Sequence, residues 1–137
     1  MSITDRTGGF WRLVGSAVEG NGGAQTLTVR PDASEVWLLH WARAWHTDSG
    51  GARTLEWFMH DNVVASAYKA KDGAAVAANV EHIFYTDAIR GPLVLEYEGL
   101  YVIIQGTGVL ATKYLNVTAL VEVFKSPLGK KRISLLP

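Results

Sequence analysis

Ser34-Glu-Val-Trp-Leu-Leu-His-Trp-Ala-Arg-Ala-Trp-His46, followed by Thr47-Asp-Ser-Gly-Gly-Ala-Arg-Thr-Leu-Glu-Trp-Phe-Met-His-Asp-Asn62, is the stretch that decides the fold. Two runs with a side-chain period of two, residues 35–46 and 53–60, flank the turn-forming segment Asp48-Ser-Gly-Gly51. Its glycines supply the positive backbone angles that a short reversal needs. Alternation at period two is typical of β-strands. We therefore predict a β-hairpin with these two runs as its arms.

Four of the five Trp residues lie in this stretch, and we expect them at an interface. Strict alternation in the first arm divides its side chains between two faces. One face carries Trp37, Leu39, Trp41, Arg43 and Trp45. The other face carries Val36, Leu38, His40, Ala42 and Ala44. Both faces are largely apolar, which predicts cover on both sides, by a second sheet and by a neighbouring subunit or a loop. The predicted interface consists of Trp37, Trp41, Arg43, Trp45 and Trp57.

Further strands flank the hairpin. Runs rich in β-branched residues predict strands over residues 10–14, 26–30, 83–85, 93–97, 100–105 and 113–124, separated by turn residues. The alanine-rich segment 72–82 fits either a short helix or an irregular connection, because its alanines form no amphipathic stripe. With the hairpin this gives about eight strands, the number found in a jelly roll. We predict an antiparallel jelly-roll β-sandwich over 10–124, a flexible N-terminal arm over 1–9 and a basic C-terminal arm over 125–137.

Composition bounds the class of protein. A chain of 137 residues is the size of one domain. Hydrophobic residues make up 48% and charged residues 19%, which favours a partner that covers part of the apolar surface. Thirteen basic residues balance thirteen acidic ones, so no net field favours nucleic acid or an anionic membrane. We find no apolar run of about 20 residues and no secretory signal, and expect a soluble protein made in the cytoplasm.

The sequence carries no recognisable catalytic pattern. Cysteine is absent, and the four histidines, His40, His46, His60 and His82, lack the His-x-His pair of cupin-type metal sites. No Gly-x-Ser-x-Gly motif marks a nucleophile. We therefore predict no enzymatic activity, no metal and no cofactor, and keep a cupin-like metalloenzyme as a third reading. A second reading is a carbohydrate-binding module, in which sugar rings stack on Trp41, Trp45, Tyr97 and Tyr101 beside Arg43.

Five segments together resemble a known family of phage proteins. They are Phe10-Trp-Arg-Leu-Val14, Gln25-Thr-Leu-Thr-Val-Arg-Pro31, Glu35-Val-Trp-Leu-Leu39, Thr47-Asp-Ser-Gly-Gly-Ala-Arg-Thr-Leu55 and Asn116-Val-Thr-Ala-Leu-Val-Glu-Val123. This order of strands and turns resembles the head decoration, or cement, proteins of tailed bacteriophages, which have a jelly-roll fold. The resemblance spans most of residues 10–124.

The resemblance implies a structural role on a virion. Such proteins bind the outer capsid surface, commonly as trimers, and clamp neighbouring major capsid subunits against internal DNA pressure. It implies a homotrimer made in the bacterial host cytoplasm, with no nucleic-acid or membrane partner. The expected capsid contacts lie on the two arms, at Arg6, Phe10, Lys130, Lys131 and Arg132. The alternative is a carbohydrate-binding or host-attachment module of a phage virion.

Overall fold

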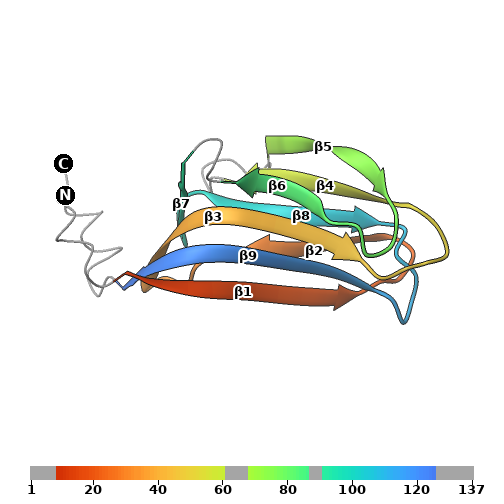
Figure 1. Ribbon diagram of the computed structural model, residues 1–137, viewed down its shortest axis with the longest axis horizontal. Coiled ribbons are helices and arrows are strands. Elements are labelled where there is room, and N and C mark those ends of the chain that lie inside the picture. Colours follow the sequence, from red (N-terminus) through yellow and green to blue (C-terminus); the bar gives the residue numbers. More distant parts are fainter. Residues whose placement is uncertain (1–8, 61–67, 87–90, 126–137) are drawn as a thin grey trace.

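The computed structural model describes residues 9–60, 68–86 and 91–125, and every regular element in them is a β-strand (Figure 1). The nine strands are β1 Phe10–Glu19, β2 Ala24–Val29, β3 Glu35–His46, β4 Arg53–His60, β5 Tyr68–Val76, β6 His82–Thr86, β7 Leu93–Glu96, β8 Tyr101–Thr107 and β9 Tyr114–Lys125. The predicted arms, 1–9 and 125–137, lie almost wholly outside the described residues.

The strands form nested antiparallel pairs: β1 with β9, β2 with β8, β3 with β6, and β4 with β5. The first and third pairs join through β9 and β3 into a five-stranded sheet of order β1-β9-β3-β6, in which β7 also pairs with β3. The second and fourth join through β8 and β4 into a four-stranded sheet of order β2-β8-β4-β5. Nested pairs that alternate between two packed sheets define a jelly roll. The predicted antiparallel jelly-roll sandwich is therefore confirmed (Figure 1).

The predicted hairpin between residues 35 and 60 is wrong. β3 and β4 have the predicted bounds, but β3 belongs to the five-stranded sheet and β4 to the four-stranded sheet. The connection is a corner held by the buried Asp48, whose carboxylate accepts hydrogen bonds from the backbone N–H groups of Gly50 and Leu110 and pairs with Arg53 at 2.9 Å. These hydrogen bonds, that of Gly50 first, lower the pKa of Asp48. The corner depends on Leu110, which is distant in sequence, so local turn chemistry does not reveal it.

The predicted division of β3 into two faces is wrong beyond Leu39. In the pairing with β9, Leu39 lies opposite Val121 while Trp41 lies opposite Leu120, so His40 forms a β-bulge. An extra residue in a strand exchanges the faces of everything that follows it. Side chains before the bulge, such as Trp37 and Leu39, point into the core, and after it Ala42, Ala44 and His46 do so. Trp41, Arg43 and Trp45 consequently point outward.

Two further expectations change. The alanine-rich segment begins as strand, because β5 continues to Val76; neither a helix nor an irregular connection describes that part. Small residues suit it, since a Cβ atom at Gly73 would lie 2.7 Å from the Glu56 side chain and 2.8 Å from that of Thr54 on β4. β1 is also longer than predicted, continuing through Glu19 before the turn to β2.

The core fills the space between the two sheets. Trp57 of β4 is fully buried, stacks on Phe84 of β6 with ring centroids 5.2 Å apart, and donates its indole N–H to the His82 carbonyl at 3.2 Å. Trp37 is 7% exposed. Trp37 and Trp57 are thus core residues, which corrects their assignment to an interface. The remaining core side chains are mainly aliphatic, among them Leu27, Val29, Leu39, Leu55, Leu95, Val102, Ile104, Leu115, Val117, Val121 and Val123.

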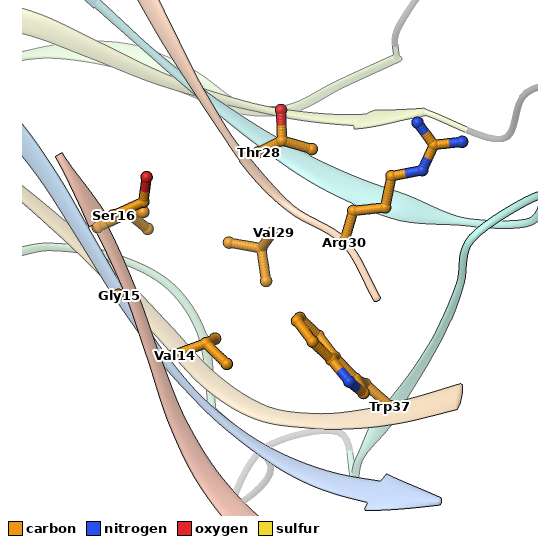
Figure 2. Close-up of a pocket in the computed structure, with 8 residues that line it drawn as sticks. Val14, Gly15, Ser16, Thr28, Val29, Arg30 and Trp37 are labelled. Carbon is orange, nitrogen blue, oxygen red and sulfur yellow. The ribbon is translucent and has the colours of Figure 1, made fainter. Parts of the chain in front are cut away.

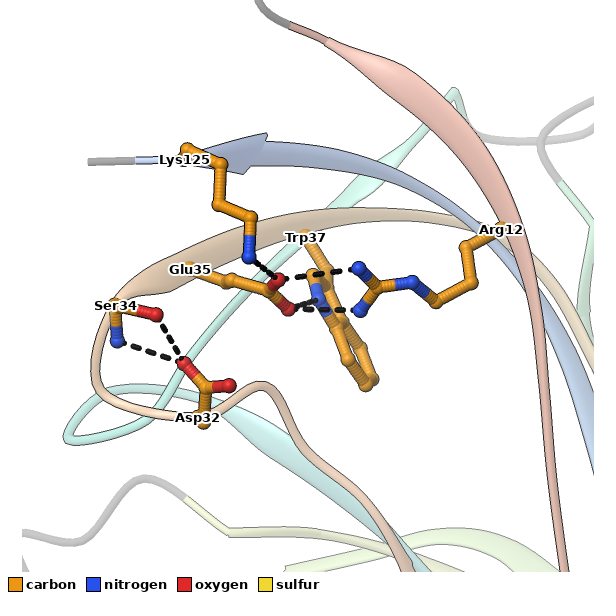
Figure 3. A network of polar contacts seen from close by, with 6 residues as sticks. All are labelled: Arg12, Asp32, Ser34, Glu35, Trp37 and Lys125. Carbon is orange, nitrogen blue, oxygen red and sulfur yellow. Dashed lines mark hydrogen bonds and ion pairs between the residues drawn. The ribbon is translucent and has the colours of Figure 1, made fainter.

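One buried carboxylate ties three strands of the five-stranded sheet together (Figure 3). The Glu35 carboxylate accepts two hydrogen bonds from the Arg12 guanidinium, at 2.9 and 3.1 Å, one from Lys125 Nζ at 2.5 Å and one from Trp37 Nε1 at 2.9 Å. Arg12 lies on β1, Glu35 and Trp37 on β3, and Lys125 on β9. The hydrogen bonds from Arg12 are the largest cause that lowers the pKa of Glu35 to about 2.

We predict that this group makes folding sensitive to acid. The pKa of Glu35 falls from its ordinary value of 4.5 to about 2 in the folded chain, so its contribution to stability is complete above the unfolded value and is lost as the pH falls toward the folded one. That loss amounts to about 3 kcal/mol. Urea unfolding between about pH 7 and pH 2 should show this decrease in the wild type.

In Glu35→Gln the decrease should be smaller by about that amount, and the variant should be less stable at neutral pH because Arg12 and Lys125 lose their charged acceptor. Glu19→Gln, which changes an exposed carboxyl at the other end of β1, serves as the control. Equal acid sensitivity in the wild type and Glu35→Gln would contradict a stabilising role for the Glu35 carboxylate.

Candidate interaction surface

The outer face of the four-stranded sheet has the composition expected of a solvated sandwich. Its outward positions alternate with the core residues of β2, β4 and β8, and most of them are polar. Polar side chains on the outer positions of an antiparallel sheet are the usual arrangement. The outward residues include Thr26, Thr28, Thr54, Glu56, Phe58, Ile103, Gln105 and Thr107.

The outer face of the five-stranded sheet is different, because large apolar side chains come from every strand of the sheet. Several are well exposed: Trp11 is 58%, Leu13 63%, Val94 47% and Ile83 38% exposed, and the others are partly exposed. We name this surface the apolar face. It consists of Trp11 and Leu13 on β1, Leu120 and Phe124 on β9, Leu38, Trp41 and Trp45 on β3, Ile83 on β6 and Val94 on β7.

Strand register brings these side chains together. Leu13 lies opposite Leu120 across the β1–β9 ladder, and Leu120 lies opposite Trp41 across the β9–β3 ladder. A continuous apolar row therefore crosses three strands. Leu38 lies opposite Val94 in the ladder between β3 and β7, which extends the surface to the edge of the sheet.

Charged groups on the apolar face are few: Arg43 with the neighbouring Glu81, Glu122 on β9, and Glu96 opposite Val36 in the β3–β7 ladder. The Arg43 guanidinium lies 4.6 Å from the centroid of the Trp41 ring and 3.4 Å from the carboxylate of Glu81. His40 Nε2 lies 3.6 Å from Glu122 Oε1, and the His40 ring lies 4.4 Å from that of Trp11. With His40 counted as neutral, three carboxylates stand against one guanidinium, so the face has a small excess of negative charge.

The size of the apolar face follows from sheet geometry. Four strands lie side by side, with β6 and β7 sharing the last position next to β3. At about 4.8 Å between strands and about 3.3 Å per residue over roughly ten residues, the whole outer face measures about 600 Å², and this area includes polar positions such as Asn116 and Thr118. The largest apolar patch of a typical monomer covers about 300–600 Å², and patches of that size are often binding sites.

The structure separates the predicted interface residues into two groups. Trp41, Arg43 and Trp45 lie on the apolar face, where all three are partly exposed, whereas Trp37 and Trp57 lie in the core. Phe10 begins β1 and is 40% exposed, with the Arg12 guanidinium 5.2 Å from its ring centroid. The other four predicted arm contacts, Arg6, Lys130, Lys131 and Arg132, lie outside the described residues.

The surface residues predicted from sequence omit Trp11, Leu13, Leu120 and Phe124, although β9 contains a signal for two of them. Its inward positions run Leu115, Val117, Ala119, Val121 and Val123. The outward positions of a half-buried strand should be polar, as Asn116 and Thr118 are, but those of β9 also include Tyr114, Leu120 and Phe124. Apolar residues in the outward phase of a strand therefore marked this face.

A small cleft lies between β1 and β2 at one edge of the sandwich (Figure 2). Its volume is about 140 Å³, and its lining includes Val14, Val29, Trp37, Val117 and Arg30. Small-molecule sites usually measure about 300–1,000 Å³, so this cleft is too small for most metabolites. Within the described part of the chain no three His, Asp or Glu side chains are grouped to hold a metal ion, and no helix there is long and apolar enough to cross a membrane.

Comparisons with known proteins do not assign this chain to a family. No family model matches the chain, and no curated protein sequence matches it. Among solved structures it is similar to infectious bursal disease virus strain Gx, with 9% identity and a TM-score of 0.38 over 87% of this chain. It is also similar to T=1 particles derived from that virus, with 9% identity and a TM-score of 0.40. A third similar structure is the VP2 subviral particle of the virus, with 10% identity and a TM-score of 0.40, and both matches cover 88% of this chain. The chain spans 32%, 32% and 38% of those proteins, about a third of their length.

We predict that a Leu→Ala substitution lowers the free energy of unfolding by different amounts on the two faces of the five-stranded sheet. Leu39 is fully buried and Leu13 is 63% exposed. Leu39→Ala should lower the free energy of unfolding by about 2–5 kcal/mol, because it empties a packed core site. Leu13→Ala should change it by less than about 1 kcal/mol. Urea unfolding followed by Trp fluorescence at low protein concentration measures both, and similar costs would contradict the assignment of Leu13 to a surface.

Proposed function

We propose that this chain is a non-enzymatic structural protein of a tailed-phage virion, a decoration or cement protein that binds the outside of the head and clamps neighbouring major capsid subunits. The observation that carries the proposal is the apolar face, since a sheet covered by Trp, Leu and Phe side chains suits contact with protein better than contact with water. The sequence resemblance to decoration proteins supports the same role, with assembly in the host cytoplasm and a place on the outer capsid surface.

The ends of the sandwich fit a clamp. Phe10 at the start of β1 lies opposite Val123 near the end of β9, so the described chain enters and leaves the sandwich at the same end (Figure 1). Lys125 is fixed there by Glu35. In our proposal Phe10, at the start of β1, and the segments 1–9 and 126–137 contact adjacent capsid subunits from this corner, the segments through Arg6, Lys130, Lys131 and Arg132.

The proposed assembly is a homotrimer without cofactor. The balance of thirteen basic and thirteen acidic residues supports protein partners over nucleic acid. In the proposed clamp, contacts between protein surfaces hold the capsid subunits together, so no reactive group is required.

Binding to phage heads tests the proposal. Purified protein is mixed with empty heads assembled from the major capsid protein of the same phage and centrifuged through sucrose. We expect the wild type to co-sediment in a fixed ratio to the capsid protein. Joint replacement of Lys130, Lys131 and Arg132 by Ala should weaken co-sedimentation, because cations that pair across an interface are removed, and leave the unfolding curve unchanged.

Lys113→Ala changes a cation at the opposite end of β9 and should bind heads like the wild type. Failure of the wild-type protein to bind heads would reject the capsid-clamp function.

A carbohydrate-binding or host-attachment module is the second candidate. It is favoured by one observation: Trp41 and Trp45 are partly exposed on either side of Arg43, whose guanidinium already stacks on Trp41. Aromatic faces next to a hydrogen-bond donor can hold a sugar ring. On this reading a glycan array should give specific signals that Trp45→Ala abolishes and that Thr28→Ala, on the opposite sheet, retains. An array without signals would exclude this candidate.

A further inference from the structure

We infer that neighbouring copies of this chain cover the apolar face, so that the five-stranded sheets line the inside of the oligomer around its symmetry axis and the four-stranded sheets face outward. This inference rests on the self-association in the proposed function and is independent of capsid binding. It names the surface that the subunits share and the orientation of each sandwich in the assembly.

The distribution of large and small side chains is the first argument. After the bulge at His40, β3 points Ala42 and Ala44 into the core and Trp41 and Trp45 outward. A strand that served only its own core would place the indoles inside, because burial of large apolar surface stabilises the fold most. The outward indoles therefore indicate that this face is buried in the assembled state.

Area is the second argument. The outer face of the five-stranded sheet measures about 600 Å² from strand spacing and rise, and a stable protein interface takes about 800 Å² from each partner. Tyr114, which takes the outward phase of β9 and is 43% exposed, extends this face at one end. One face of one sheet is thus close to the size that one side of a subunit contact needs.

Charge is the third argument and decides between partners. Two identical faces repel each other when each has a large net charge of one sign. Here the charged side chains are few: Arg43 lies beside Glu81, and Glu122 and Glu96 add a small excess of negative charge. A strongly acidic or basic partner would instead be matched by a large excess of opposite charge on this face. The mainly aromatic and aliphatic surface fits another copy of itself better than a highly charged partner.

Single-cysteine variants test the inference, because the chain contains no cysteine that would interfere. Leu13→Cys places a thiol on the apolar face, and Thr28→Cys places one on the outer face of the four-stranded sheet as the matched control. Both positions are exposed in the single chain, so neither variant disturbs the core. Labelling with a thiol reagent is followed across a range of protein concentrations, together with the solution mass from light scattering.

We expect a mass that is a multiple of 14.9 kDa. Labelling of Leu13→Cys should slow by about tenfold or more as the oligomer forms, because mass action removes the open subunit, while labelling of Thr28→Cys should not change. Leu13→Lys should dissociate the oligomer and Thr28→Lys should leave it intact, and both should keep the wild-type strand signal in circular dichroism.

A monomer at all concentrations would overturn the inference, and so would an oligomer in which both cysteines react equally fast. A monomer that binds heads and protects Leu13→Cys only there would assign the apolar face to the capsid. That result would keep the proposed function and reject the second copy. Conversely, an oligomer that protects Leu13→Cys from labelling but does not bind phage heads would support the inference and reject the capsid-clamp function.

Discussion

The register of β3 against β9 is the constraint on which both the core and the apolar face depend. One extra residue, His40, exchanges the two faces of β3 for the rest of the strand. Without the bulge the indoles of Trp41 and Trp45 would point into the sandwich, and Ala42 and Ala44 would point outward. Because side chains alternate with period two, a single insertion determines whether these Trp residues fill a core or build a surface.

The buried carboxylates of the sandwich hold its strands and one of its corners in place. Glu35 joins β1, β3 and β9 near one end, and Asp48 fixes the corner between β3 and β4 near the other. Both carboxylates are held ionised by hydrogen bonds and by a neighbouring Arg, which lowers the pKa of each. A carboxylate that is fully paired and has a lowered pKa is a poor general acid at neutral pH. The contacts of these two buried carboxylates are therefore explained by folding.

Sequence patterns predicted this fold well where it depends on local periodicity and poorly where it depends on distant contacts. The bounds of β3 and β4 follow from alternation and turn residues, and the strand count led to the jelly roll. The bulge at His40 and the corner at Asp48 depend on partners in β9 and at Leu110, which no local pattern reveals. The same limit applies to the interface. Trp41, Arg43 and Trp45 were predicted to lie on a surface, yet Trp37 was grouped with them because period two carries no information about an inserted residue.

Placing large side chains outside and small ones inside limits what the isolated sandwich gains from its core. Each outward indole leaves part of its apolar surface in water in the single chain, and the proposed self-association would remove that surface from water. A capsid clamp needs one contact that makes the oligomer and another that holds the shell. In the proposed clamp the apolar face would make the first contact, because its apolar row is continuous across three strands of the five-stranded sheet. The second contact would start from the end of the sandwich where β1 begins and β9 ends, opposite each other in the ladder. The proposal therefore assigns the two contacts to separate parts of the molecule.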